Sequence, residues 1–386
     1  MSTPAEERHP AGRPGADSHR PVRVRYPELV SVTAQIFEKH AVPTARAQAA
    51  ARALCYGDLV GIDSHGLINL SRLYLPLFAQ GRVDAGADIE PVADRGAAML
   101  VDAHRALGLW AAGEAMRLAI ERAAELGVAM VSMRGGTHFG CAGFHAAQAV
   151  PHQMIGIVAS NCGGQRIARP PGGTVTMLGT NPIAIAAPAG RQHPFVLDMS
   201  TTVVPTGRIR SAARSGRAIP PGWLDDDRGR PVTDPNAFDR GDAHLLWLGG
   251  RPETGAFKGF GLGLLVEVLA ALVCGAATGL HPEALSGDGG PTGTDDDIGM
   301  IAIAIAPGEL RGADAFISDI ERAFGTLLAC PSAGPAPVRY PGWHEAESAR
   351  RHARIGVPLA RSLYRELADI AAELGLAAPA VIGAGR

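Results

Sequence analysis

Apolar side chains follow a helical spacing at both ends of the chain. They recur every three or four residues over 27–40, 44–59 and 67–80, and again over 355–376. Each stretch is therefore expected to form a helix with one apolar face. Because helices at the two ends of a chain often pack together, we expect these segments to form one helical domain. The middle of the chain is then an insertion in that domain.

In the middle, apolar runs of strand length alternate with helical runs. The expected strands are 98–101, 128–133, 155–160, 183–187, 195–199 and 298–306. The expected helices are 107–126, 142–153, 209–215, 258–277 and 313–328. The run over 258–277 is strongly apolar, but it contains Glu267 and several glycines, so it is interpreted as a buried core helix rather than a membrane span.

These patterns divide the chain into four segments. Residues 1–25 are rich in Pro, Gly and Arg and lack an apolar stretch, so we predict a disordered arm without a secretion signal. Residues 26–95 are predicted to be the first part of the helical domain, 96–330 a mixed α/β domain, and 331–386 the C-terminal part of the helical domain.

Charge and cysteine content exclude several classes of protein. The formal net charge is −2, which argues against a general nucleic-acid or membrane-surface binder. The five cysteines are scattered and show no metal-binding spacing, so we expect neither a disulfide framework nor a metal site, and we expect a cytoplasmic location. Lys39 and Lys258 are the two lysines among 36 basic residues. A lysine in such an arginine-rich chain is a candidate for a role that a guanidinium cannot fill.

The glycine-rich dinucleotide fingerprint of an ordinary Rossmann domain is absent from the sequence. The glycines at 259, 261 and 263 have the wrong spacing for it, and no strand precedes them. We interpret them as positions of close helix packing.

Two histidines lie in short turns that contain glycine. His65 stands in Asp63-Ser64-His65-Gly66, and His138 in Thr137-His138-Phe139-Gly140. Each is either a structural histidine or an acid/base group, since imidazole titrates near neutral pH. Asp63 either orients the ring of His65 or caps the helix that follows.

A predicted strand over 195–198 delivers Asp198 to a loop that is rich in hydroxyl groups. Met199, Ser200 and Thr201 follow directly. Hydroxyl and backbone N–H groups at a strand end are suited to polar ligands such as phosphates.

Seven segments, in order, resemble one family. They are GIDSHGL (61–67), GGTHFGCAGFHAA (135–147), LGTNPIAIAAP (178–188), FVLDMSTTVVPTGRIRSAARSGRAIPPGW (195–223), TDP (233–235), FKGFGLGLLVEVL (257–269) and YPGWHEAESARRHARIGVPL (340–359). Together they resemble the malate/L-lactate dehydrogenase family of the second type, which is unrelated to the Rossmann lactate dehydrogenases. That family includes ureidoglycolate, sulfolactate and diketogulonate enzymes and piperideine-2-carboxylate reductase. The resemblance covers about residues 26–376.

The resemblance implies a fold of the α/β class, with a non-Rossmann, mixed-sheet nicotinamide-binding domain inserted into a helical domain. It also implies NAD or NADP as cofactor and a homodimer. By resemblance, His65 is the proton donor or acceptor, and His138 is a second imidazole of the active site, together with Asp198. The cofactor contacts that it implies are Asn161, Cys162, Met199, Ser200, Thr201, Lys258, Gly342 and His344.

The segment after His65 departs from the family pattern. Family members often carry an arginine four residues after this histidine, where it can bind the substrate carboxylate, and this chain has Asn69 there. Arg72 lies on the same expected helix face, so we expect Asn69 and Arg72 at the substrate. An aromatic residue usually follows nearby, and here Leu73 precedes Tyr74.

We therefore predict an oxidoreductase that moves a hydride to or from C2 of a small 2-oxo acid, 2-hydroxy acid or cyclic imino acid. Loss of the arginine at position 69 also fits a modified or carrier-bound substrate. The competing hypothesis is a binding or scaffold protein that kept the fold without turnover. In either case the expected partner is a small molecule, not nucleic acid or a membrane.

Overall fold

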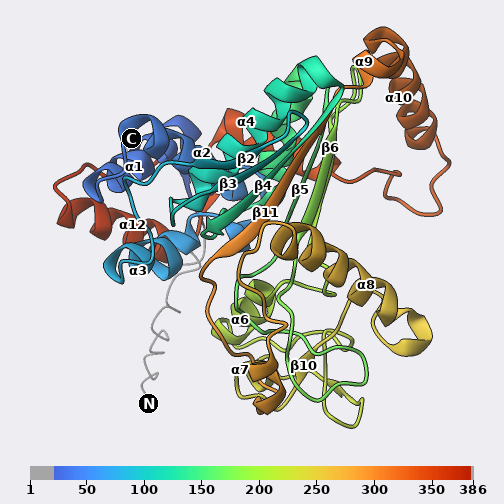
Figure 1. Ribbon diagram of the computed structural model, residues 1–386. Helices are drawn as coiled ribbons and strands as arrows, with labels where there is room; N and C mark the ends of the chain where they lie inside the picture. The colour runs from blue at the N-terminus through green and yellow to red at the C-terminus, as the bar shows by residue number, and fades with distance from the viewer. Residues whose placement is uncertain (1–20, 384–386) are drawn as a thin grey trace, which may run out of the picture.

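A seven-stranded mixed sheet forms the centre of the computed structural model, which describes residues 21–383 (Figure 1). Its strand order is β2-β3-β4-β11-β5-β6-β7. The strands are β2 (Glu90–Asp94), β3 (Ala98–Asp102), β4 (Val128–Gly136), β11 (Ile298–Ile305), β5 (Ile155–Ser160), β6 (Ile183–Ala187) and β7 (Phe195–Met199). β3 and β4 run parallel, and every other neighbouring pair in this sheet is antiparallel.

Helices pack against the central strand β11 on both faces of the sheet. Successive side chains of a strand point to opposite faces. Met300, Ala302 and Ala304 accordingly join the core under α4 (Gly108–Leu126). Ile301 joins a second core under α8 (Ala256–Val266) and the π-helical turn that continues it (Glu267–Leu272). Burial on both faces explains why β11 reads as an unbroken apolar run.

The helices at the two ends of the chain share one hydrophobic core. α1 (Tyr26–Lys39) and α2 (Thr44–Val60) pack with α12 (Arg361–Glu373), and α11 (Trp343–Ile355) contacts α2. Figure 1 shows the blue and red ends of the chain side by side. β1 (Val22–Val24) pairs antiparallel with β12 (Val357–Leu359) across this unit. The expected packing of the two ends is therefore what the structure shows.

Several elements differ from the expected ones. β1 lies inside the segment predicted to be disordered, and residues 1–20 of that arm lie outside the described residues. β2 falls on the helical side of the expected boundary at residue 95, yet it pairs with β3. The run 142–153 is α5 (Ala142–Ala146) followed by a 3₁₀ segment, Ala147–His152, that contains Pro151. Proline has no N–H for the α-helical hydrogen bond, which accounts for the change.

The expectation of a buried core helix over 258–277 was wrong for one of its faces. One side of α8 and its π turn covers the sheet, while Phe257, Leu265, Val268, Leu272 and Val273 on the helix are between 45% and 64% exposed. Mean apolarity reports how apolar a segment is but not which of its faces the rest of the chain covers. Among the described residues, no helix is long and apolar enough to cross a membrane.

Two smaller units extend from the sheet. One contains α6 (Thr206–Arg214), α7 (Asn236–Asp239) and a three-stranded sheet of β10 (His244–Leu245), β8 (Leu224–Asp225) and β9 (Pro231–Val232) around its own core. The other contains α9 (Pro307–Arg311) and α10 (Ala313–Leu328), which project away from the sheet (Figure 1).

Candidate active site

Two imidazole rings lie face to face where the helical unit meets the sheet. His65 ends a 3₁₀ turn (Asp63–His65) that follows α2, and His138 stands in the loop after β4. Their ring centroids are 6.1 Å apart and their planes are inclined by 20°. Burial lowers the pKa of His65, and burial followed by the neighbouring His65 lowers the pKa of His138 to about 4. Both rings are therefore neutral at pH 7 in the free protein.

Hydrogen bonds from neighbouring residues stabilise the turn that carries His65. Ser64 Oγ lies 2.9 Å from His65 Nδ1, so Ser64 rather than Asp63 contacts the ring. The Asn69 side-chain amide donates to the Ser64 carbonyl at 3.0 Å. Asp58, buried at the end of α2, accepts a bond of 2.7 Å from the Leu67 N–H, and its carboxyl group packs on Gly66, where a Cβ would lie 2.4 Å from it.

His138 is held by a residue to which the sequence analysis assigned no role. Tyr74 Oη lies 2.8 Å from His138 Nδ1, and the Gly140 N–H donates to the same nitrogen at 3.3 Å. Tyr74 is fully buried and ends a π-helical turn, Leu70–Tyr74, that leads into α3 (Leu75–Ala79). An aromatic residue in the helix after His65 was the available signal. Nothing in the local pattern showed which imidazole it would meet.

Asp198 supports the loop that carries His138. Its Oδ2 accepts a bond of 2.8 Å from the Gly143 N–H at the start of α5, and a side chain at Gly143 would collide with it. Burial raises the pKa of Asp198 to about 6, although the Gly143 bond opposes this. Asp198 is therefore bonded to the backbone of α5, the helix that follows the His138 loop.

The edge strand β7 ends in the expected cofactor residues. Met199 and Ser200 are half-buried, and buried Thr201 bonds the Thr180 carbonyl through both its N–H and its hydroxyl, at 3.0 and 2.9 Å. Gly342 caps the N-terminus of α11 at φ +90° and packs on Val196 of β7, where a Cβ would lie 2.7 Å from the backbone nitrogen.

This region contains backbone groups of the kind that bind phosphates. A helix N-terminus beside a glycine presents N–H groups and a partial positive charge to a phosphate. The exposed His344 follows in the first turn of α11. The contact of the strand end and the helix terminus with a cofactor stays a prediction.

Asn161 is buried, whereas Cys162 is half-buried. Asn161 Oδ1 accepts from the N–H groups of Gly163 and Gly299, and its Nδ2 donates to the Ala277 carbonyl at 2.7 Å and to Glu267 at 3.2 Å. Cys162 Sγ lies 3.7 Å from Thr180 Oγ1. The Asn161 side chain is therefore bonded within the protein, and its contact with the cofactor stays a prediction.

Glu267 is the second residue that sequence reasoning missed. Its carboxyl group is buried and accepts from Asn161, from Asn181 at 2.7 Å and from Thr278 at 2.6 Å. These hydrogen bonds connect the loops of its three partners to the π-helical turn that follows α8. In the sequence, Glu267 stands out only as an interruption of an apolar run.

Lys258 is exposed in the first turn of α8. Its Nζ lies 5.9 Å from the centre of the Phe257 ring, and the described residues place no acidic group within ion-pair distance of it. Gly259 packs on Leu248 and Gly263 on Trp247, each with less than 3 Å for an added Cβ, which confirms close packing at these two glycines. No atom lies within 4 Å of that position at Gly261.

A group of arginines lies near the His65 turn. α6 packs on this turn, where a Cβ at Gly207 would lie 3.3 Å from Ser64 Cβ. The pKa of Arg214 in α6 is lowered by burial and then by the charges of Arg72 and Arg210. Arg210 pairs with Asp239 at 2.9 Å, whereas the described residues give Arg72 no acidic partner. Positive charge is therefore available beside the imidazole pair.

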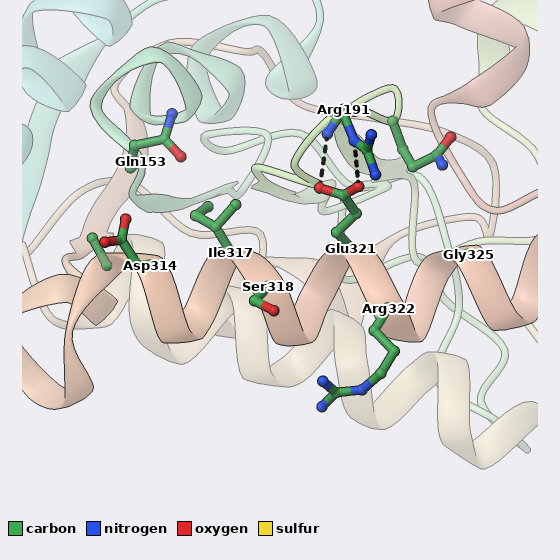
Figure 2. A pocket seen from close by; sticks show the side chains of 10 residues that line it. Gln153, Arg191, Asp314, Ile317, Ser318, Glu321, Arg322 and Gly325 are labelled. Atoms are coloured by element: carbon green, nitrogen blue, oxygen red, sulfur yellow. Dashed lines mark hydrogen bonds and ion pairs between the residues drawn. The ribbon is translucent and has the colours of Figure 1, made fainter.

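A cavity elsewhere in the described part of the chain contains none of these residues. It is an open groove of about 870 Å³ along α10, lined by Gln153, Arg191 and residues of that helix (Figure 2). Figure 2 shows Arg191 and Glu321 paired across it, with Nε 2.7 Å from Oε1. The groove holds no histidine or cysteine, so chemistry rather than shape identifies the candidate site. Among the described residues, no group of acidic, histidine and cysteine side chains is arranged to hold a metal ion.

Comparisons with known proteins show the family of this chain. The family model for malate/L-lactate dehydrogenase matches residues 24–368. Malate dehydrogenase of Pyrococcus abyssi is 36% identical over 67% of this chain and 71% of its own length, and L-sulfolactate dehydrogenase of Methanothermobacter thermautotrophicus is 31% identical over 92% and 98%. The crystal structure of malate dehydrogenase from Entamoeba histolytica has a TM-score of 0.85 at 25% identity, over 92% of this chain and 99% of that one. The chain belongs to the malate/L-lactate dehydrogenase family, and it is an oxidoreductase of hydroxy acids that uses NAD or NADP.

Proposed function

We propose that this protein interconverts a small 2-oxo acid and the corresponding 2-hydroxy acid, or a cyclic imino acid and its amine, by hydride transfer at C2. The observation that carries the proposal is the pair of stacked, neutral imidazoles, His65 and His138, each held by its own Nδ1 partner. The relatives named for malate and sulfolactate act on 2-hydroxy acids, which supports the same substrate class here.

The chain's own residues supply the proton and the orientation. When bound, the nicotinamide supplies or accepts the hydride. His65 is half-buried, so its imidazole can pass a proton between the solvent and the oxygen or nitrogen on C2. His138 faces His65 and can hydrogen-bond the same atom. Met199, Ser200, Thr201, Gly342, His344 and Lys258 are the proposed cofactor residues, with Asn161 and Cys162 behind them.

The substrate carboxylate is proposed to bind Arg72. The Asn69 amide already donates to the Ser64 carbonyl, so it stabilises the His65 turn and offers less to a ligand. Arg72 is exposed, and the described residues provide it with no ion pair. A guanidinium binds a carboxylate through two parallel hydrogen bonds, which an amide cannot do.

The test is turnover of a panel of 2-oxo acids, cyclic imines and 2-oxo amides with NADH and NADPH. For a free acid held by Arg72, the Arg72→Ala variant should lose activity by about 100-fold, roughly the upper value for hydrogen bonds to a charged group, and Asn69→Arg should restore part of it. Arg365→Ala, in the exposed face of α12, is the matched control.

Other outcomes identify other functions. A substrate without a free carboxylate, such as an amide or a carrier-bound acid, would leave Arg72→Ala nearly as active as wild type. Cofactor binding without turnover of any panel member would instead support the binding or scaffold protein. The retained imidazole pair argues against that alternative.

We also propose a homodimer. The exposed apolar side chains of α8 and its π turn, Leu265, Val268 and Leu272, follow at intervals of three and four residues on one helix face. A stripe of this kind is suited to association with its own copy about a two-fold axis. The five cysteines are all free thiols, which supports a reducing compartment such as the cytoplasm.

A further inference from the structure

The hydrogen bonds around His138 determine which of its nitrogens carries the proton. Two donors converge on Nδ1, namely the Gly140 N–H at 3.3 Å and the Tyr74 hydroxyl at 2.8 Å. An amide N–H can only donate, so it would face an N–H if Nδ1 were protonated. A phenol can donate or accept, and it fits an unprotonated Nδ1 by donating. The described residues place no hydrogen-bond partner at Nε2.

We propose that Tyr74 is a positioning residue that fixes His138 as the tautomer with its proton on Nε2. This inference rests on the proposed function for its chemical meaning. In that reaction, His138 presents an N–H donor to the carbonyl oxygen or imine nitrogen of the substrate. A donor aimed at an atom that gains negative charge stabilises the transition state.

The hydrogen bonds at His138 Nδ1 also imply different roles for the two imidazoles. To give up its Nε2 proton, neutral His138 would have to take a proton at Nδ1 from Tyr74. Burial holds the pKa of Tyr74 well above its ordinary value, so the phenol keeps its proton. The proton that reaches the substrate therefore comes from His65, which is half-buried and takes up a proton from the solvent before it gives one to the substrate. His138 remains a hydrogen-bond donor throughout.

The contact between Tyr74 and His138 depends on a π-helical turn. A π-helical turn holds one residue more than an α-helical turn, and such turns occur often at functional sites. Leu70–Tyr74 forms such a turn, anchored by a 2.5 Å bond from Ser71 Oγ to Glu366 of α12. The turn carries Tyr74, rather than Leu73, to His138. The Tyr74 ring also packs edge-on against Phe37, at 6.4 Å between ring centres.

Histidine NMR tests the proposal directly. In protein labelled with ¹⁵N-histidine, the His138 signals, assigned by their loss in His138→Gln, should show an N–H at Nε2 and a bare Nδ1 at pH 7. Tyr74→Phe removes the hydroxyl and keeps the ring, so the second tautomer should become visible. Tyr364→Phe, which removes a hydroxyl bonded to the Pro379 carbonyl, is the matched control and should leave these signals unchanged.

Kinetics give the second readout. Tyr74→Phe should lower kcat by about tenfold or more while KM changes little, because the lost orientation affects the transition state most. A donor at Nδ1 favours the neutral ring, so its removal raises the pKa of His138. The acidic limb of the pH profile of kcat/KM should therefore move toward neutral pH. The other titratable neighbours of His138 are His65 and Asp295, which is paired with Arg82, and both are unchanged in this variant.

The two hypotheses can fail separately. A wild-type His138 with its proton on Nδ1 would overturn the inference even if the enzyme reduces 2-oxo acids. An Nε2–H tautomer that persists unchanged in Tyr74→Phe would also overturn the role of Tyr74. Failure of the whole substrate panel would remove the proposed function and leave the NMR result standing.

Discussion

Asp58 is a buried carboxyl group whose ionisation should destabilise the fold. It lies at the end of α2 beneath the His65 turn, 4% exposed, and burial is the main cause that raises its pKa from 3.8 to about 7. The Leu67 N–H opposes the shift, and Asp63 adds to it. No cation is among the causes of this shift, so the ionised form is stabilised by hydrogen bonds alone.

The magnitude follows from the linkage between proton binding and folding. The folded state holds the Asp58 proton more tightly than the unfolded chain, so its stabilising effect is present below about pH 4 and is lost as the pH rises to about 7. Each pH unit in that window costs about 1.4 kcal/mol, which gives at most roughly 4 kcal/mol at pH 8. Asp58→Asn keeps an oxygen for the Leu67 N–H and carries no charge. The variant should therefore unfold at a higher temperature than wild type at pH 8.

Thermal unfolding of both proteins, at one protein concentration and from pH 4.5 to pH 8.5, measures this difference. The advantage of Asp58→Asn should grow between pH 4.5 and 7 and then level off. Asp369→Asn, at an exposed position of α12, is the control and should show no such growth. A variant less stable than wild type at pH 8, or a constant difference across the range, would show that the ionised carboxylate is not strained in this site.

Three further predictions concern the site and the assembly. His65→Asn should lower kcat by about 100-fold or more with cofactor affinity near wild type, and full turnover at every pH would remove His65 from the mechanism. Lys258→Met should weaken cofactor binding by roughly 1–3 kcal/mol in titration calorimetry, while Lys39→Met, at the other lysine, should not. Val268→Asp combined with Leu272→Asp should convert a dimer to monomers in sedimentation velocity. Leu310→Asp, in exposed α9, should leave the dimer intact, and a monomeric wild type would refute the assembly.

The sequence predicts most of the α/β core because its signals are local. β5, β6 and β7 begin and end at the expected residues, and β11 ends one residue early. β1 was not predicted, because a three-residue strand is stabilised by β12, more than 300 positions along the chain. The exposed face of α8 was missed for a related reason, since burial depends on what packs against a helix and not on its own apolarity.

The same contrast between local signals and distant contacts applies to the candidate site. Motifs pointed to His65, His138 and Asp198, and the structure stacks the two imidazoles and bonds Asp198 of β7 to α5, which follows the His138 loop. The residues that hold them escaped notice because their partners are distant in sequence. Tyr74 meets His138 across 64 positions, and Glu267 meets Asn161 across 106. Neither contact leaves a periodic or spaced signal. A sequence motif therefore points to candidate catalytic groups more readily than to the residues that hold them in place.

The structure gives Asn69, which stands where family members often have an arginine, a role in the turns around the two imidazoles. In the sequence, Asn69 stands as a lost arginine and Tyr74 as an aromatic displaced from its usual place. In the structure, Asn69 bonds the Ser64 carbonyl, and the π turn that follows directly brings Tyr74 to His138. The two changes thus lie in one continuous segment that stabilises both imidazoles. A segment altered in this way while both rings remain positioned is consistent with a changed means of binding the carboxylate, and it is difficult to reconcile with the loss of catalysis.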